Sequence, residues 1–235
     1  MTHLFELPVP AVPIAGSGQT FPVRRIYCVG RNYVEHAQEM GFSGREPPFF
    51  FAKPGDAIVN VAPGQTATIP YPPQTANLHH EIELVVAIGK RGADIAEADA
   101  GQYVFGYAVG IDMTRRDLQM DLRKAGRPWE LGKAYDQSAP IGPIHPAASV
   151  DGIGQARIWI EVNGEPRQDS SIAKLIWNVP ETIAYLSRYF ELHPGDLIFT
   201  GTPAGVGAVV AGDTMHGGVE GLGELRVKVG AADAT

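Results

Sequence analysis

The stretch LHHEIELVVAIG, residues 78–89, decides the fold class. Its β-branched and apolar residues favour a strand, and the unbroken apolar run at 84–88 indicates burial on both faces of a sheet. Side chains two apart on a strand point to the same face, so we expect the carboxylates of Glu81 and Glu83 to converge. Buried carboxylates are costly unless a cation compensates them, which points to a metal site. A solvated strand face carrying both glutamates is the alternative.

A third carboxylate, Asp112, ends another apolar strand, VFGYAVGID at residues 104–112. Three carboxylates form an all-oxygen ligand set, which selects Mg²⁺ or Mn²⁺ over zinc, with Ca²⁺ as a substitute. Three protein ligands leave coordination positions open, which suits a chelating 2-oxo acid and its enolate. We therefore predict that Glu81, Glu83 and Asp112 bind the metal.

Composition points to many short strands in one large domain. The 28 glycines and 19 prolines among 235 residues exceed the usual shares of about 7% and 5%, which favours strands joined by tight turns. The 44% hydrophobic content is enough for one core. We expect a β-rich α+β fold, with residues 1–23 as an extended N-terminal arm that includes a hairpin at 16–18. Residues 24–235 are expected to form a single catalytic domain.

Several classes of protein are excluded. The formal charge is −7 and the basic residues are scattered, so there is no electrostatic footprint for nucleic acid. The single cysteine, Cys28, allows no internal disulfide and suits a reducing compartment. Neither a secretory signal nor an apolar run of about 18 residues is present, so no membrane partner is expected. The cytoplasm is the predicted location.

Three further local patterns predict secondary structure. Asn163 and Gly164 form the strongest short hairpin signal between two strands. Asn178 and Glu181 are spaced as a helix capping box. Thr114 and the acidic residue three positions later have the same spacing, so they are expected to cap a helix that runs through residue 124.

A histidine and a glutamate form a candidate catalytic dyad. The segment NYVEHAQEMG, residues 32–41, has helical character, and His36 and Glu39 lie three positions apart on one face. The carboxylate would orient the imidazole and support its charged form while the imidazole deprotonates water. Two surface residues on an exposed helix turn are the alternative.

Other polar side chains are candidates for substrate contacts. Lys53 and Lys133 adjoin apolar segments and could meet an anionic substrate or an oxyanion, or be exposed lysines at strand ends. Arg116 and Gln119 share a helix face just after the third carboxylate, and that face could instead be solvated. Thr202 lies in TGTPAGVG, residues 200–207, which lacks the lysine of a phosphate-binding P-loop but could cradle a carboxylate.

Taken together, seven motifs occur in a characteristic order: GRNYVEHAQEM, FFAKP, LHHEIELVVAIGK, GYAVGIDMTRRDLQ, KAYDQSAP, VNGEPRQ and GDLIFTGTPAGVG. With these motifs the chain resembles the fumarylacetoacetate hydrolase family, from about Arg24 to Val229, and within it the short, single-domain acylpyruvate hydrolase branch. The resemblance implies a mixed β-sandwich roll with flanking short helices, often as a homodimer.

The resemblance also implies roles for individual residues. It assigns Mg²⁺ or Mn²⁺ to the three carboxylates and water activation to His36 and Glu39, on a lid that orders over the substrate. It assigns contacts with the substrate or an oxyanion to Lys133, Arg116 and Gln119, and it places the substrate carboxylate at Thr202. Arg31 and Lys53 are carried over as further substrate contacts.

The same resemblance implies a reaction. The segments PVRRIYCVGRNY, REPPFFFAKP and RPWELGKAYDQSAPIGPIHP are most similar to bacterial enzymes of this branch that hydrolyse fumarylpyruvate in gentisate catabolism. The implied activity is metal-dependent cleavage of a carbon–carbon bond in a 2,4-dioxo acid, giving fumarate and pyruvate. Oxaloacetate decarboxylation or dienoate isomerisation at the same metal site is one alternative. A noncatalytic metal-dependent binder of oxo acids is another.

Overall fold

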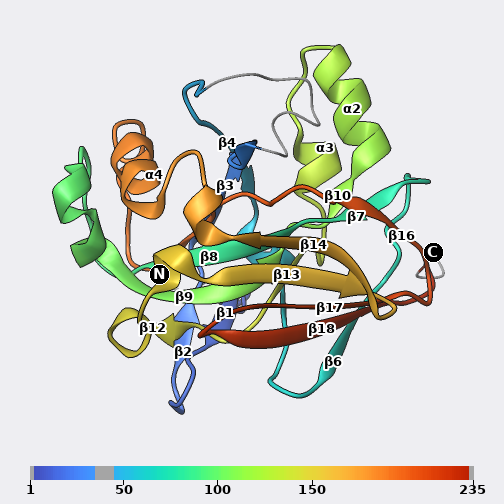
Figure 1. The fold of residues 1–235 in the computed structure, drawn as a ribbon, viewed down its shortest axis with the longest axis horizontal. Helices are drawn as coiled ribbons and strands as arrows, with labels where there is room; N and C mark the ends of the chain where they lie inside the picture. The colour runs from blue at the N-terminus through green and yellow to red at the C-terminus, as the bar shows by residue number, and fades with distance from the viewer. Residues whose placement is uncertain (1–2, 35–44, 233–235) are drawn as a thin grey trace.

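The computed structural model describes residues 3–34 and 45–232, which form two large β-sheets with short helices at their edges (Figure 1). The larger sheet has the spatial order β4-β3-β15-β8-β9-β11-β5, and β12 pairs with β9. The bounds of its strands are β3 Arg25–Gly30, β4 Phe49–Lys53, β5 Ile58–Asn60, β8 Ile82–Ile88, β9 Val104–Ile111, β11 Ala139–Ile141, β12 His145–Pro146 and β15 Asp196–Phe199. The β3–β15 and β5–β11 pairs are parallel and the other pairs in this sheet are antiparallel, so the sheet is mixed.

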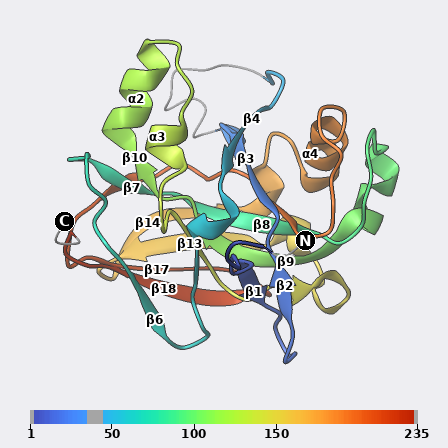
Figure 2. The ribbon, with the colours of Figure 1, turned by 180° about the vertical axis from the view of Figure 1, so that it is seen from behind.

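The second large sheet has the order β14-β13-β17-β18-β6. Its strands are β6 Thr66–Ile69, β13 Arg157–Val162, β14 Glu165–Ser171, β17 Thr214–Val219 and β18 Gly223–Val229. A three-stranded sheet, β10-β7-β16, consists of β7 Leu78–His80, β10 Thr114–Arg115 and β16 Gly207–Val209. Seen from behind, the five-stranded sheet again lies below the level of α2 and α3 (Figure 2). The predicted β-rich α+β fold is confirmed.

The helices are short and lie at the margins of the sheets. The α-helices are α2 Arg116–Lys124, α3 Glu130–Lys133 and α4 Val179–Leu186. Single 3₁₀ segments occur at Gly55–Ala57, Glu97–Tyr103, Ala147–Ser149, Ile153–Gln155 and Ile172–Lys174. Helices α2 and α3 stand close to the β4 end of the larger sheet, while α4 lies on the far side of that strand (Figure 1). None of the helices within residues 3–34 and 45–232 is long and apolar enough to cross a membrane.

Strand β8 is the centre of the core, because all of its residues are buried. Alternate side chains enter different clusters: Leu84 packs with the five-stranded sheet, whereas Val85 packs with β3 and β15 on the opposite face. Val86 joins a third cluster that includes Ile183 and Leu186 of α4. This two-sided burial is what the apolar run at 84–88 predicted, and it fixes the strand that carries the candidate metal ligands.

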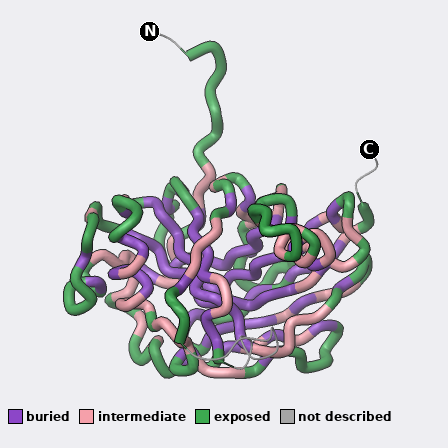
Figure 3. Tube along the Cα trace, turned by 90° about the horizontal axis from the view of Figure 1, so that it is seen from above, coloured by how far each residue is buried: buried purple, intermediate pink, exposed green. Residues whose placement is uncertain are grey.

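The N-terminal residues divide into a packed hairpin and an exposed segment. Strands β1 Ala11–Pro13 and β2 Thr20–Pro22 pair antiparallel, which confirms the hairpin expected at 16–18. Val12 and Phe21 of this hairpin are buried in the core cluster on the β3 side. Residues 3–9 are exposed and project from the body of the molecule (Figure 3). The division at residue 23 stays a prediction.

The turn and capping predictions have different outcomes. The Asn163–Gly164 hairpin is confirmed, and both residues have the positive φ angles (55° and 82°) that this turn requires. The capping box of Asn178 and Glu181 is also confirmed. The one expected from Thr114 is wrong, because Thr114 belongs to β10 and helix α2 begins two residues later without a side-chain cap.

Candidate metal centre and active site

Three carboxylates meet where β8 and β9 lie side by side. Glu83 belongs to β8, Asp112 directly follows β9, and Glu81 occupies a break between β7 and β8. The break corrects the expectation of one continuous strand over 78–89. Each of the three residues offers one oxygen within 4.8 Å of the others, and all three are at most 5% exposed. The predicted convergence of the three carboxylates is confirmed.

Two buried lysines compensate the charge of this cluster. Lys133 donates from Nζ to Oε2 of Glu81 at 2.8 Å, to Oδ2 of Asp112 at 2.7 Å and to Oγ1 of Thr114 at 2.7 Å. Lys53 Nζ lies 2.8 Å from the other oxygen of Asp112. Neither lysine is exposed at a strand end, because each is only 2% exposed. The ammonium group of Lys133 is therefore a fixed donor to two carboxylates, and that of Lys53 forms an ion pair with one of them.

Arg116 and Gln119 approach the cluster from the first turn of α2. The Arg116 guanidinium donates to Oε1 of Glu81 and to Oε1 of Gln119. It also donates from Nε to Nδ1 of His79 at 3.4 Å. Burial and the charge of Arg116 lower the pKa of His79 to about 4, so the imidazole is neutral and accepts this hydrogen bond. The predicted shared helix face is present and points at the metal ligands rather than into solvent.

Buried negative charge is concentrated around Glu83, which lies beside both other carboxylates. Burial, together with repulsion from Asp112 and Glu81, raises the pKa of Glu83 well above its ordinary value. The backbone N–H of Gly201, 2.7 Å from Oε2, offsets this only in part. Burial alone would lower the pKa of Lys133, but the neighbouring carboxylates outweigh it and the pKa is raised. Lys133 is therefore a charged donor at neutral pH and not a base.

This donor set fits a hard divalent cation. Carboxylate oxygens are the ligands that Mg²⁺ and Mn²⁺ prefer, and such a cation would offset the repulsion among the carboxylates that raises the pKa of Glu83. Imidazole and thiolate ligands are absent from the cluster among the residues that the structure describes, which disfavours zinc. The chain thus has a group of carboxylates, Glu81, Glu83 and Asp112, that is able to bind a metal.

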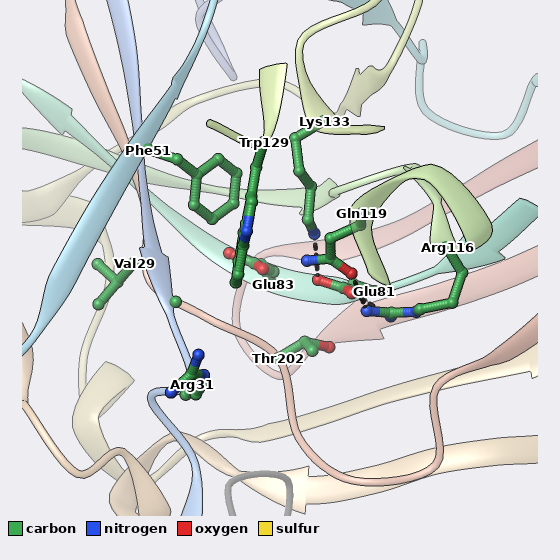
Figure 4. Close-up of a pocket in the computed structure, with 11 residues that line it drawn as sticks. Val29, Arg31, Phe51, Glu81, Glu83, Arg116, Gln119, Trp129, Lys133 and Thr202 are labelled. Carbon is green, nitrogen blue, oxygen red and sulfur yellow. Dashed lines mark hydrogen bonds and ion pairs between the residues drawn. The ribbon is translucent and has the colours of Figure 1, made fainter. Parts of the chain in front are cut away.

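A pocket opens above the carboxylates and collects most of the predicted substrate contacts (Figure 4). Its lining consists of Val29, Gly30, Arg31, Phe51, Glu81, Glu83, Arg116, Gln119, Trp129, Lys133 and Thr202. Lys53 is not among these residues and lies behind Asp112, where it also donates to Ser138 at 3.0 Å. His36 and Glu39 lie outside the described residues. The roles assigned to all of these side chains stay predictions.

Two aromatic side chains of the pocket wall were missed by sequence reasoning. Phe51 of β4 and Trp129, just before α3, have ring centroids 5.9 Å apart. Figure 4 shows both rings on the side of the pocket opposite Arg116. Both residues lie inside the sequence segments that carry the family resemblance. An aromatic residue in a sequence, however, is equally compatible with a pocket wall and with the hydrophobic core.

Gln168 is a third residue whose role the sequence alone did not indicate. Its side-chain oxygen faces Nδ1 of His80 at 3.0 Å and accepts from the backbone N–H of Ile82 at 3.2 Å. Its amide nitrogen donates to Oγ1 of Thr202 and to the carbonyl of Pro203, both at 2.7 Å. One buried amide therefore ties the break beside Glu81 to the glycine-rich turn that carries Thr202.

The sequence of the chain matches the model of a known family. Residues 25–230 match fumarylacetoacetate (FAA) hydrolase C-terminal. The chain belongs to the fumarylacetoacetate hydrolase family. Its strand-rich fold and its buried carboxylate cluster are therefore features of a family member, and the resemblance inferred from the seven motifs is confirmed.

Individual members of the family are similar over most of the chain. A fumarylpyruvate hydrolase from Ralstonia sp. is 50% identical over 188 residues, which are 80% of this chain and 95% of the relative. The crystal structure of a fumarylpyruvate hydrolase from Pseudomonas aeruginosa, in complex with Mn²⁺ and pyruvate, is 61% identical, with a TM-score of 0.96 and coverage of 98% of this chain and 100% of that chain. The mitochondrial oxaloacetate tautomerase FAHD1 of Rattus norvegicus is 41% identical over 206 residues, covering 88% of this chain and 91% of the relative.

Proposed function

We propose that this chain is a metal-dependent acylpyruvate hydrolase, with fumarylpyruvate as its substrate and fumarate and pyruvate as its products. The observation that carries the proposal is the buried cluster of Glu81, Glu83 and Asp112 beneath a pocket that also presents Lys133 and Arg116. The high identity to two fumarylpyruvate hydrolases supports the choice of acyl group.

The charges of the site suit a dianionic substrate. When all three are ionised, the carboxylates carry three negative charges, which balance the three cations that contact them, Lys53, Lys133 and Arg116. A divalent cation held by the carboxylates would leave this group with two positive charges. Fumarylpyruvate carries one carboxylate at each end, so its two negative charges would neutralise the loaded site.

The proposed mechanism divides the work among the residues of the pocket. A bound Mg²⁺ or Mn²⁺ supplies Lewis-acid polarisation of the 2-oxo acid end. Lys133 stays protonated and donates to the oxygen on which negative charge develops. Arg116 and Gln119 orient the same end of the substrate, and Thr202 binds its carboxylate. The bond between C3 and C4 then breaks, because the departing pyruvate leaves as an enolate that these donors stabilise.

Water activation is assigned to the dyad of His36 and Glu39. The imidazole takes a proton from water, the resulting hydroxide attacks the C4 carbonyl, and the carboxylate stabilises the imidazolium. The proton is then transferred to C3 of the departing enolate. One water molecule is consumed, and one fumarate and one pyruvate are formed. This assignment rests on the family resemblance.

A second function uses the same pocket without hydrolytic water. Tautomerisation or decarboxylation of oxaloacetate, like isomerisation of a dienoate, needs only stabilisation of an enolate. The similarity to an oxaloacetate tautomerase supports this second function. The tautomerase, however, shares a lower sequence identity with the chain than the fumarylpyruvate hydrolase does. A noncatalytic binder of oxo acids would turn over none of these compounds.

A substrate panel tests these functions directly. Fumarylpyruvate, acetylpyruvate and oxaloacetate are each incubated with the protein and Mg²⁺, Mn²⁺ or a chelator, and ultraviolet absorbance and released products are followed. The proposal expects fumarate and pyruvate from fumarylpyruvate at the highest kcat/KM, and loss of turnover with chelator. Turnover of oxaloacetate alone would overturn it in favour of the second function.

We further propose that the enzyme acts in the cytoplasm as a homodimer. The exposed side chains of Leu4, Phe5, Leu7 and Val9 support an assembled state, because a projecting apolar segment gains stability by packing on another surface (Figure 3). Light scattering of the full chain and of a variant lacking residues 1–9 tests the assembly. A monomeric full chain would contradict it.

A further inference from the structure

A second cleft opens beside the metal pocket and shares three lining side chains with it, Arg31, Phe51 and Trp129. The cleft continues along Phe49 of β4 and the loop from Gly126 to Glu130 between α2 and α3. Figure 4 shows the three shared side chains on the flank of the pocket that is opposite Arg116. A ligand seated at the carboxylates can therefore extend into this cleft.

The charged side chains of the cleft are mostly basic. Arg31, Arg123 and Arg127 line it together with one carboxylate, Glu130. Burial and the charge of nearby Arg123 lower the pKa of Arg31, so the fold holds two guanidinium groups close enough to repel each other. Both remain charged, because an arginine does not deprotonate at neutral pH. The negative charge of Glu46 acts in the opposite direction on Arg31, and a carboxylate bound between the two guanidinium groups would do so for both of them.

The backbone at Arg31 is also unusual. Its φ angle is 58°, in the left-handed region that residues other than glycine adopt only rarely. Residues held in this region cluster at ligand sites, where the surrounding structure fixes them. The guanidinium carbon lies 5.0 Å from the centroid of the Phe49 ring, which holds the charge at the mouth of the cleft.

Aromatic rings give the cleft an apolar wall. The rings of Phe49 and Trp129 meet edge to face with centroids 5.1 Å apart. Phe51 extends this wall toward the metal pocket. A planar conjugated chain is well suited to such a surface, because it buries its faces without leaving polar groups unpaired.

We propose that this cleft binds the distal carboxylate of a dianionic, conjugated acylpyruvate, with Arg123 and Arg127 as specificity-determining residues. The inference rests on the proposed function and adds the part of the site that selects the acyl group. The 2-oxo acid end lies at the metal ligands, the enoyl chain runs along Trp129, and the far carboxylate reaches the guanidinium groups. Arginine suits this role because its planar fork matches a carboxylate.

A matched pair of substrates isolates the distal carboxylate. Fumarylpyruvate and crotonylpyruvate have the same enoyl chain, but a methyl group replaces the distal carboxylate in the second. The ratio of their kcat/KM values is measured for the wild type, for Arg123→Gln/Arg127→Gln and for Arg127→Lys. Lys124→Gln is the control, because it removes one positive charge from the same helix at a residue outside the cleft.

The expected result is a ratio that favours fumarylpyruvate in the wild type and falls about 10- to 100-fold in the double variant. Arg127→Lys should retain part of the preference, and Lys124→Gln should keep the wild-type ratio. An unchanged ratio in the double variant, or an equal fall in Lys124→Gln, would overturn the inference while leaving the hydrolase activity in place. Failure of the wild type to hydrolyse either substrate would instead overturn the proposed function.

Discussion

The ammonium group of Lys133 lies 2.7 Å from Oδ2 of Asp112, and neither side chain is more than 2% exposed. Lys53 holds the other oxygen of the same carboxylate at 2.8 Å. A divalent cation at this site must therefore share Asp112 with two lysines. This arrangement would keep fixed positive charge beside a bound metal, where the proposed reaction forms an enolate oxygen, and it makes the lysines part of the stability of the fold.

Replacing Lys133 by Met tests the structural half of this relationship. The variant keeps the bulk of the side chain but leaves Glu81 and Asp112 without their shared donor. Removing one partner of a buried ion pair costs about 3–5 kcal/mol, because the remaining charge is desolvated and unpaired. We expect a loss of this size in urea denaturation with chelator present, and a smaller loss with saturating Mn²⁺. Hydrolysis should fall by at least about 100-fold.

Lys124→Met is the matched control for this experiment. Lys124 pairs with Asp121 at 3.8 Å on the exposed face of α2, where an ion pair contributes at most about 1 kcal/mol. Its stability and activity should stay near wild type. Equal stability of the two variants would show that the pair between Lys133 and Asp112 does not stabilise the fold.

Metal affinity should depend on pH through Glu83. Its pKa is raised in the metal-free fold, so the folded protein binds the proton of Glu83 more tightly than the unfolded chain does. The resulting contribution to the free energy of unfolding is fully present below the ordinary glutamate pKa. It is lost as the pH rises through the raised pKa. Mn²⁺ requires the ionised carboxylate, and binding therefore releases a proton. We expect the rise in melting temperature on adding Mn²⁺ to be larger at pH 8 than at pH 5.5.

The variant Glu83→Gln separates this effect from general acid sensitivity. A neutral amide removes one ligand charge, so Mn²⁺ affinity measured by calorimetry should fall by at least about 10-fold and lose most of its pH dependence. Glu220→Gln, at an exposed residue outside the cluster, should bind Mn²⁺ like the wild type. An affinity of the wild type that is independent of pH would contradict the linkage.

The sequence predicted the parts of the site that depend on short-range rules. Glu81 and Glu83 have the spacing of one strand face, and Asp112 directly follows β9, which pairs with β8. Alternation and strand pairing were enough to predict that the carboxylates converge, although Glu81 lies in a break between strands. The capping box at Asn178 and the hairpin at Asn163 are likewise local. Each depends on backbone geometry within four residues.

The sequence could not predict parts that depend on tertiary contacts. Thr114 has the spacing of a helix cap, but its hydroxyl accepts from Lys133 nineteen residues away, and β10 pairs with β7 instead of starting the helix. The break at Glu81 is fixed in part by Gln168, far along the chain. Local sequence patterns do not identify partners that are distant along the chain. The position of Thr114 in a strand and the break at Glu81 could therefore be found only in the folded structure.

Gln168 gives a prediction for a residue that does not touch the pocket. Gln168→Leu removes the amide that joins His80, Ile82 and Thr202, and each buried polar group left unpaired costs about 1–3 kcal/mol. Stability in urea should fall by about that amount or more. Because Thr202 loses the hydrogen bond from Gln168 and keeps only the one to the carbonyl of Ile82, KM for the acylpyruvate should rise more than kcat falls.

The control for Gln168 is Gln102→Leu, since Gln102 is exposed and its side chain bonds Asp99 only locally. It should leave both KM and stability close to wild type. A lower kcat of Gln168→Leu at unchanged KM would instead show that this amide mainly positions Glu81, a candidate metal ligand. It would then have little effect on the turn that carries Thr202.

Replacing His36 by Ala distinguishes hydrolysis from enolate chemistry. Hydrolysis of an acylpyruvate needs an activated water, and loss of a general base typically lowers the rate by about 10²- to 10⁴-fold. Tautomerisation or decarboxylation of oxaloacetate needs the metal ligands and Lys133 but no nucleophilic water. We therefore expect His36→Ala to lose turnover of fumarylpyruvate while any activity on oxaloacetate falls much less.

The measurement is kcat/KM of both substrates at saturating Mn²⁺, with His3→Ala as the control at an exposed histidine of the N-terminal arm. Mn²⁺ affinity is determined in parallel, because an intact metal site shows that His36→Ala acts on the chemical step. Unchanged hydrolysis of fumarylpyruvate would exclude His36 as the base. An equal loss of kcat/KM on both substrates would indicate that His36 shapes the pocket. Only hydrolysis needs the proton transfer from water that is assigned to His36, so a loss in that step would affect fumarylpyruvate alone.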